Sequence, residues 1–253
     1  MSNSERAIKL NWAKVNFIYS SLFNNIIMNS IDKNPNYKQI YKFVKDKFDR
    51  TTHFKHGPFD ETYYTLRVYE SAKEIIGKLN KSVKKEQVLV ACILHDIGKI
   101  KLKPSKMFSK HEVLENASEE WHKHAKLSVP IAKKFLKKIG HSDEFIEEVC
   151  YLIENHDLRG DKLQERSIEL QIIQDADLIA DIGFAGFIRP FLYCGKFSKQ
   201  SVISSIEFIK KEDRTEGGDE INLPISKDIA KREMKIQSDL VKEISKEIDS
   251  NLL

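Results

Sequence analysis

Apolar residues recur in this chain with the period of an α-helix almost from end to end. Strict alternation of apolar and polar residues, the pattern of a half-buried strand, is almost absent. Glycine and proline are scarce, with 10 and 6 among 253 residues, so few positions break the helical pattern. The sequence therefore predicts an all-α bundle, and a chain of this length can bury a substantial core.

The periodicity also gives the expected order of the elements. Helices are predicted at 8–30, 36–49, 61–80, 84–97, 118–139, 143–156, 164–182 and 184–211, the last interrupted at Arg189-Pro190 and Gly195, with a lysine-rich amphipathic helix after Pro224. Residues 51–60, 100–117 and 212–224 are predicted to be loops, the second lying over the mouth of a site. The stretch 84–97 is rich in valine and isoleucine and is also compatible with a buried strand, but its length and its helical surroundings favour a central helix that is buried all round.

The composition argues against several classes of protein. The net charge is +4, and the lysines fall between acidic residues as on solvated helix faces, so a nucleic-acid partner is possible but not favoured. No apolar run is long enough to span a bilayer, and the N-terminus lacks the apolar segment of a signal peptide. Cys92, Cys150 and Cys194 are widely spaced and flanked by apolar residues. This pattern favours free, mostly buried thiols and a cytoplasmic protein that does not bind membranes.

The pair His95-Asp96 is the first candidate for chemistry. It follows the apolar run 88–94 and precedes Ile97-Gly98-Lys99. An imidazole and a carboxylate at the end of a buried segment are costly unless they are paired or ligated. The dipeptide alone carries little information, because a second one occurs at His156-Asp157. Its position at a helix end, with more histidine and aspartate downstream, makes it half of a predicted metal site.

Further donors are predicted to point inward from other helices. His156 continues the apolar series of helix 143–156, and His124 shares a face with Leu127 and Ile131. Asp175 and Asp177 lie in the apolar run 172–183, which contains no lysine or arginine, and periodicity does not decide between them. Taken alone, His156 also fits an ordinary core position and His124 an ordinary surface position. Together with the aspartates, the two histidines predict a metal centre. Histidine and carboxylate without cysteine suit Mn, Fe, Co, Ni, Mg or catalytic Zn.

These motifs resemble the HD-domain metal-dependent phosphohydrolases over about residues 50–195. The resemblance rests on His95-Asp96-Ile97-Gly98-Lys99, on His124 followed by Ser128, on His156, and on the Ala176-Asp177 run that continues to Arg189. It implies an HD-type bundle at 51–211, with an N-terminal helical extension at 1–50 and a C-terminal loop and amphipathic helix at 212–253. It further implies that His95, Asp96 and Asp177 are core ligands. His124 and His156 would be the additional ligands of two-metal members, Asp96 would bridge two ions, and Lys99 would reach the phosphate.

The chain departs from the family pattern at one position. The family places its first ligand histidine three residues before an Arg-Val pair, and here Tyr64 stands three residues before Arg67-Val68. A neutral phenol is a poor ligand for a divalent ion. Either His56 or His53, in the loop just upstream, takes this place, or the first metal site is weakened. We expect two ions about 3.5–4 Å apart, with His56 as the sixth ligand beside His95, Asp96, His124, His156 and Asp177.

The resemblance implies hydrolysis of a nucleotide or a related phosphoester or phosphoanhydride. A phosphomonoesterase, a phosphodiesterase and a pyrophosphohydrolase all fit, with Asp96 and Lys99 as the catalytic residues. One alternative is a di-iron oxygenase on the same scaffold, because ferric iron tolerates a phenolate such as that of Tyr64. The other is a non-enzymatic module that senses a nucleotide with a degraded site. An oligomer is possible through the C-terminal amphipathic helix.

Overall fold

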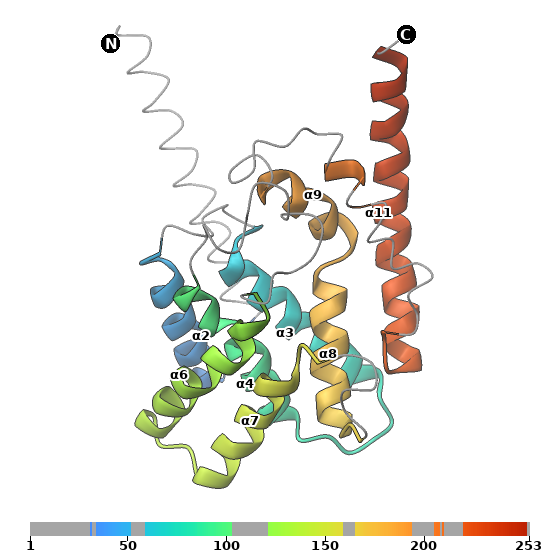
Figure 1. Ribbon diagram of the computed structural model, residues 1–253. Helices are drawn as coiled ribbons and strands as arrows, with labels where there is room; N and C mark the ends of the chain where they lie inside the picture. Colours follow the sequence, from blue (N-terminus) through green and yellow to red (C-terminus); the bar gives the residue numbers. More distant parts are fainter. Residues whose placement is uncertain are drawn as a thin grey trace, which may run out of the picture.

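The computed structural model describes residues 31, 34–51, 59–102, 121–158, 165–193, 205–207, 209 and 220–251. Within these ranges every regular element is a helix, and the all-α prediction is confirmed (Figure 1). The α-helices are α2 (Pro35–Phe48), α3 (Glu61–Lys78), α4 (Lys85–Leu94), α6 (His124–Lys138), α7 (Asp143–Asn155), α8 (Ile168–Ala180), α9 (Gly183–Tyr193) and α11 (Pro224–Asn251). Two short 3₁₀ helices are η2 (Ile97–Lys101) and η3 (Trp121–Lys123).

Local capping explains where these helices begin and end. Asp60 accepts hydrogen bonds from the N–H groups of the first turn of α3, and Ser142 and Ser167 do the same for α7 and α8. At the end of α6, Gly140 has φ of 90°, and the next N–H donates to the Leu136 carbonyl at 3.2 Å. This left-handed glycine stop is the end that the sequence predicts at Gly140. The start predicted at 164 is wrong, because the Ser167 cap fixes the beginning of α8 at Ile168.

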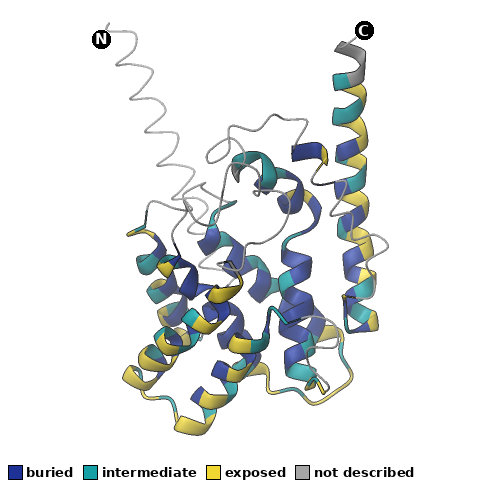
Figure 2. Ribbon diagram, viewed as in Figure 1, coloured by how far each residue is buried: buried dark blue, intermediate teal, exposed yellow. Residues whose placement is uncertain are grey.

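Helix α4 lies at the centre of the bundle and packs against α2, α3, α7 and α8 (Figure 1). Every side chain from Val88 to Leu94 is fully buried, as Figure 2 shows by its dark ribbon. The predicted central helix is confirmed, but it ends at Leu94 and the chain tightens into η2 at Ile97. Ile40 of α2 and Ile229 of α11 belong to the same core, so helices outside 51–211 also cover α4 and α8.

Helix α9 corrects one prediction. It continues through Pro190, where an interruption is expected from the sequence. A proline inside a helix removes one backbone hydrogen bond and costs about 3 kcal/mol. Phe187 and Phe191, on either side of Pro190, pack with Val241 and Leu240 of α11 in a second apolar cluster. We attribute the continuity of α9 to this packing.

Some expectations fall on residues outside the described ranges. These include helix 8–30, Gly195, Cys194 and nearly all of the loop at 100–117. Cys92 and Cys150 are free and buried, as expected. Among the described helices, none combines the length and the apolar character that a membrane crossing requires.

Candidate metal centre

The His95-Asp96 pair lies at the junction between α4 and η2. His95 is the C-cap residue of α4 and Asp96 is the N-cap residue of η2. The turn is held against α6 at Gly98, whose N–H donates to Ser128 Oγ at 2.8 Å. A Cβ at position 98 would lie 2.2 Å from the carbonyl oxygen of His124. Glycine therefore allows η2 to approach α6 closely enough to bring Asp96 and His124 together.

Two further histidines reach the same place from other helices. His124 is the first residue of α6, and His156 is the C-cap residue of α7. Both side chains are buried, with exposed fractions of 3% and 1%. Their Nε2 atoms lie 3.1 Å apart, and the two rings meet edge to face. The prediction that both imidazoles point inward is confirmed.

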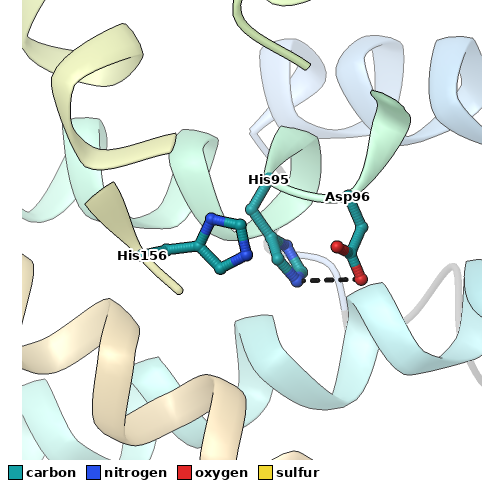
Figure 3. A group of neighbouring side chains, drawn as sticks. All are labelled: His95, Asp96 and His156. Atoms are coloured by element: carbon teal, nitrogen blue, oxygen red, sulfur yellow. Dashed lines mark ion pairs between the residues drawn. The ribbon is translucent and has the colours of Figure 1, made fainter. Parts of the chain in front are cut away.

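The donor atoms of the site converge around Asp96. Figure 3 shows the side chains of His95, Asp96 and His156 close together. One ligand atom from each of the three lies within 4.8 Å of the others. His95 Nε2 lies 3.2 Å from Asp96 Oδ2 and 3.3 Å from Asp177 Oδ1. His124 Nε2 lies 3.2 Å from Asp96 Oδ1. Five of the six predicted ligands are thus brought together, whereas His56, like His53, lies outside the described residues.

His95 and His156 are oriented by the same local device. In each case Nδ1 lies within hydrogen-bond distance of the carbonyl oxygen three residues earlier, at 2.8 Å from Cys92 and at 2.7 Å from Ile153. When Nδ1 carries the proton, it donates to that carbonyl and leaves the Nε2 lone pair facing the site. A backbone acceptor that fixes the ring in this way is the usual support of a metal-binding histidine.

The site meets the physical test for a bound cation. Among the described residues, His95 Nε2 and both carboxylate oxygens of Asp96 are buried without a hydrogen bond of good geometry, and their close neighbours are the titratable groups of Lys99, His124 and Asp177. Buried polar atoms need partners, and a cation among these atoms would supply one that they share. Imidazole nitrogens and carboxylate oxygens are suitable donors for a divalent transition metal or catalytic zinc. The residues present therefore fit a divalent metal ion.

The electrostatics of the metal-free site point in the same direction. Burial disfavours a charged His95, but the carboxylates of Asp96 and Asp177 outweigh it and raise the pKa of His95 to about 10. Burial likewise opposes ionisation of Asp96, yet His95 and Lys99 hold the pKa of this carboxyl well below its usual range. Burial, followed by the charge of His95, lowers the pKa of His156 to about 4. The ionised carboxylates of Asp96 and Asp177 therefore hold a proton on His95, and a metal ion would take the place of that proton beside the neutral imidazole of His156.

The structure separates Asp177 from Asp175. Asp177 faces His95, whereas Asp175 is fully buried on another side of α8. There its carboxylate accepts hydrogen bonds from the N–H groups of Asn222 and Leu223 at 2.8 and 2.9 Å. The choice that periodicity leaves open is thus decided: Asp175 binds the segment before α11, and Asp177 belongs to the site.

Tyr64 lies beside the cluster, in the position where the family pattern expects a histidine. Its ring centroid is 6.0 Å from that of His95, and only 5% of the residue is exposed. Its hydroxyl donates to Asp177 Oδ1 at 2.7 Å. Burial, then the charge of Asp177, raises the pKa of this phenol well above 10. Tyr64 is therefore a neutral donor to Asp177.

Lys99 is a buried member of the site. Its Nζ lies 2.6 Å from Asp96 Oδ2 and 3.1 Å from Glu61 Oε2, and the residue is 3% exposed. Glu61, which is fully buried, also pairs with Arg189 at 3.3 Å. Lys99 therefore lies inside the charged cluster and is not a solvated surface lysine.

The sequence does not indicate Glu61 or the role of Arg189. Glu61 pairs with Lys99, 38 positions away in the chain, and with Arg189, 128 positions away. The only local signal is that Glu61 opens an apolar helix face.

His122 is exposed and pairs with Asp157 at 2.8 Å, so the second His-Asp pair is divided between the interior and the surface.

Comparison with protein families matches residues 63–181 to the HD domain. The match spans α3 to α8 and includes all five clustered donors. Residues 63–181 thus resemble an HD domain. No curated protein matches the sequence.

Solved structures show the same HD-type helical fold. An HD superfamily hydrolase from an uncultured Thermotogales bacterium is 20% identical, with a TM-score of 0.54 over 87% of this chain and 98% of that one. Bacillus subtilis YpgQ in complex with ADP is 21% identical, with a TM-score of 0.55 over 84% and 97%. An HD-superfamily hydrolase from Bacillus thuringiensis is 18% identical, with a TM-score of 0.54 over 85% and 97%. At these identities the likeness shows the fold, and it extends beyond the HD domain itself.

Proposed function

We propose that this chain is a metal-dependent phosphohydrolase acting on a nucleotide or a related phosphoester or phosphoanhydride. The observation that carries the proposal is the buried cluster of His95, Asp96, His124, His156 and Asp177, whose imidazole nitrogens and carboxylate oxygens converge. The HD domain supports hydrolysis as the reaction class. YpgQ, which shares the fold, binds ADP, and this supports a nucleotide as substrate.

The ligand set favours two ions. Asp96 has one carboxylate oxygen toward His124 and the other toward His95, so it is placed to bridge. His95 and Asp177 would complete one side, and His124 and His156 the other. When bound, divalent ions supply Lewis acidity toward a phosphoryl oxygen and lower the pKa of a coordinated water.

The chain's own residues then position the reactants. With metal bound, Asp96 would orient the attacking water while it serves as a ligand. Lys99 lies beside Asp96 and offsets the negative charge of the phosphoryl group from that position. The helix ends that carry the ligands are held by packing and by backbone hydrogen bonds, so the site is rigid before substrate arrives.

The oxygenase alternative receives no support from Tyr64. A phenol must lose its proton to become a ligand of ferric iron. The Tyr64 phenol keeps its proton, because it donates a hydrogen bond to Asp177 and its pKa is raised. A nucleotide-sensing module remains the competing proposal, and the following experiment distinguishes it from a phosphohydrolase.

The test is phosphate or pyrophosphate release from a panel of nucleotides and generic phosphodiesters, with protein reconstituted in turn with Mn, Co, Ni, Mg, Fe and Zn. We expect turnover with at least one metal, about two metals per chain by elemental analysis, and loss of one metal and most activity in His124→Ala. His141→Ala is the matched control, because His141 stacks on Phe145 and precedes α7, at the opposite end of that helix from His156. Its metal content and activity should be unchanged. Retention of a nucleotide without product would favour the sensing module, and a single metal unaffected by His124→Ala would refute the two-ion site.

A further inference from the structure

A hydrogen-bond network that contains none of the predicted ligands connects α8 to the turn that carries His156. Its first member is Gln174, which is fully buried in the middle of that helix. The side-chain Nε2 of Gln174 donates to the carbonyl of Asn155 at 3.0 Å and to that of Leu158 at 2.8 Å. These two carbonyls stand on either side of His156, so one amide group holds both ends of the turn that carries the imidazole.

The second member is Asn222, which lies outside the HD domain, just before α11. Its Nδ2 donates to Gln174 Oε1 at 3.2 Å and to Asp175 Oδ1 at 2.8 Å. Its Oδ1 accepts a hydrogen bond from Arg166 at 2.5 Å. Asn222 thus fixes the Gln174 amide, and with it the direction of the Nε2 group that faces the His156 turn.

From these contacts we infer that Gln174 is a positioning residue for His156 and that Asn222 sets its orientation. The inference rests on the proposed metal site, because it gives the network a purpose beyond packing. The turn at 155–158 follows the end of α7 and has a single internal backbone bond, from Leu158 N–H to Asn155 at 3.2 Å. Without Gln174 the two carbonyls lose a buried donor, the turn loosens, and the imidazole no longer stays at one position relative to Asp96. Support of this kind is worth about 10- to 100-fold in metal affinity.

The experiment uses the full chain and two measurements. In the metal-free protein, the His156 Cε1–Hε1 signal is followed by NMR in selectively labelled samples and assigned with His156→Ala. Titration with Co²⁺ alone, read by its visible absorption, gives the metal affinity. The test variant is Gln174→Met, which keeps the length of the side chain and removes both donors. The matched control is Gln171→Met, on the same helix, where the amide donates to the Arg166 carbonyl and does not touch the turn.

We expect Gln174→Met to broaden or shift the His156 signal and to raise the Kd for Co²⁺ about tenfold or more. Gln171→Met should leave both unchanged. Asn222→Ala removes the side-chain hydrogen bonds to Gln174, Asp175 and Arg166 but leaves the Gln174 donors in place. It should shift both readouts in the same direction by a smaller amount, and it provides the test if Gln174→Met does not fold. A sharp, unshifted signal and an unchanged Kd in folded Gln174→Met would overturn the inference, even if the variant melts at a lower temperature. Failure of the wild-type protein to bind Co²⁺ would count against the proposed function, and the NMR signal alone would then decide the positioning role.

Discussion

Tyr64 and Asp177 are joined at two atoms across the interface of α3 and α8. The hydroxyl of Tyr64 lies 2.7 Å from the carboxylate Oδ1 of Asp177 and 3.0 Å from its backbone carbonyl. A donor placed between the side chain and the backbone of the same residue restricts the rotation of that side chain. Tyr64 therefore holds Asp177 toward His95, although it is itself an unsuitable metal ligand.

We predict that Tyr64→Phe weakens metal binding without unfolding the protein. The ring packing stays, but Asp177 loses its donor and regains rotational freedom, so we expect a Kd for Mn²⁺ or Co²⁺ about tenfold higher. Isothermal titration calorimetry measures this directly. Tyr63→Phe is the control, because the carboxylates that act on that neighbouring phenol are those of Asp60 and Asp49. Equal affinities for wild-type protein and Tyr64→Phe would show that Asp177 needs no such support.

The buried ammonium of Lys99 should matter most in the metal-free state. Lys99→Met removes the closest cation from Asp96 and one of the two buried cations that pair with Glu61, the other being Arg189. Breaking a buried ion pair costs about 3–5 kcal/mol, so denaturant unfolding with a chelator present should show a loss of that size. Added Mn²⁺ should recover part of it, because its charge also lies beside Asp96.

The comparison for Lys99 is Lys84→Met. Lys84 is exposed and pairs with Glu148 on the surface, and such pairs contribute less than about 1 kcal/mol. If both substitutions cost the same, or if Mn²⁺ restores nothing to Lys99→Met, the close coupling of Lys99 to Asp96 is wrong.

Gly98→Ala should disrupt the contact between η2 and α6. The added methyl group would lie 2.2 Å from the His124 carbonyl and 2.6 Å from the Ser128 nitrogen, both backbone atoms that cannot rotate away. We expect a loss of stability of about 1–3 kcal/mol together with weaker metal binding. Gly77→Ala is the opposite case, since a methyl group added there, inside α3, would have no atom within 4 Å. It should be neutral or stabilise the protein by up to about 1 kcal/mol. Thermal unfolding measures the stability of the two variants, and metal titration measures their affinity. Equal results for Gly98→Ala and Gly77→Ala would contradict the close contact between η2 and α6.

Metal binding should release protons at neutral pH. The pKa of His95 is about 10 in the folded, metal-free protein and about 6.5 in an unfolded chain. Because the folded value is higher, this histidine contributes stability that is complete below about pH 6.5 and is lost as the pH rises through 10. A ligand histidine must first lose the proton that its Nε2 carries, so the apparent affinity for metal should rise between about pH 7 and 9.

The number of protons released follows from calorimetric titrations in buffers of different ionisation enthalpy. His95→Ala removes the titrating group. This substitution should lower the metal affinity and make the remaining affinity less dependent on pH. An affinity that is independent of pH in the wild-type protein would show that His95 is neutral before the metal binds.

The sequence predicts those features of the site that depend on local periodicity. His156 continues an apolar series, and His124 opens a helix with one buried face, so both are found buried. The helix order follows for the same reason, with boundaries correct to a few residues except where a cap such as Ser167 moves them.

What the sequence does not predict depends on contacts between distant segments. Asp175 and Asp177 differ because Asn222 and Leu223 bind the first of them, and no pattern within α8 contains that information. The pairing of Lys99 with Glu61 is likewise a product of how α3 packs beside η2. Pro190 misled the prediction because packing against α11 outweighs a local penalty.

The backbone capping of His95 and His156 makes metal affinity depend on the last turn of two helices. Each ring is aimed by a carbonyl of its own helix, in α4 and in α7, so fraying of either end releases a ligand while the rest of the bundle stays folded. Conversely, a metal centre that includes both imidazoles would act as a cross-link between two helix ends that are 61 residues apart in the chain. Metal binding therefore disfavours local unfolding of these two turns, and local unfolding weakens metal binding. Slower backbone amide exchange at the ends of α4 and α7 would then report how much of the protein has metal bound.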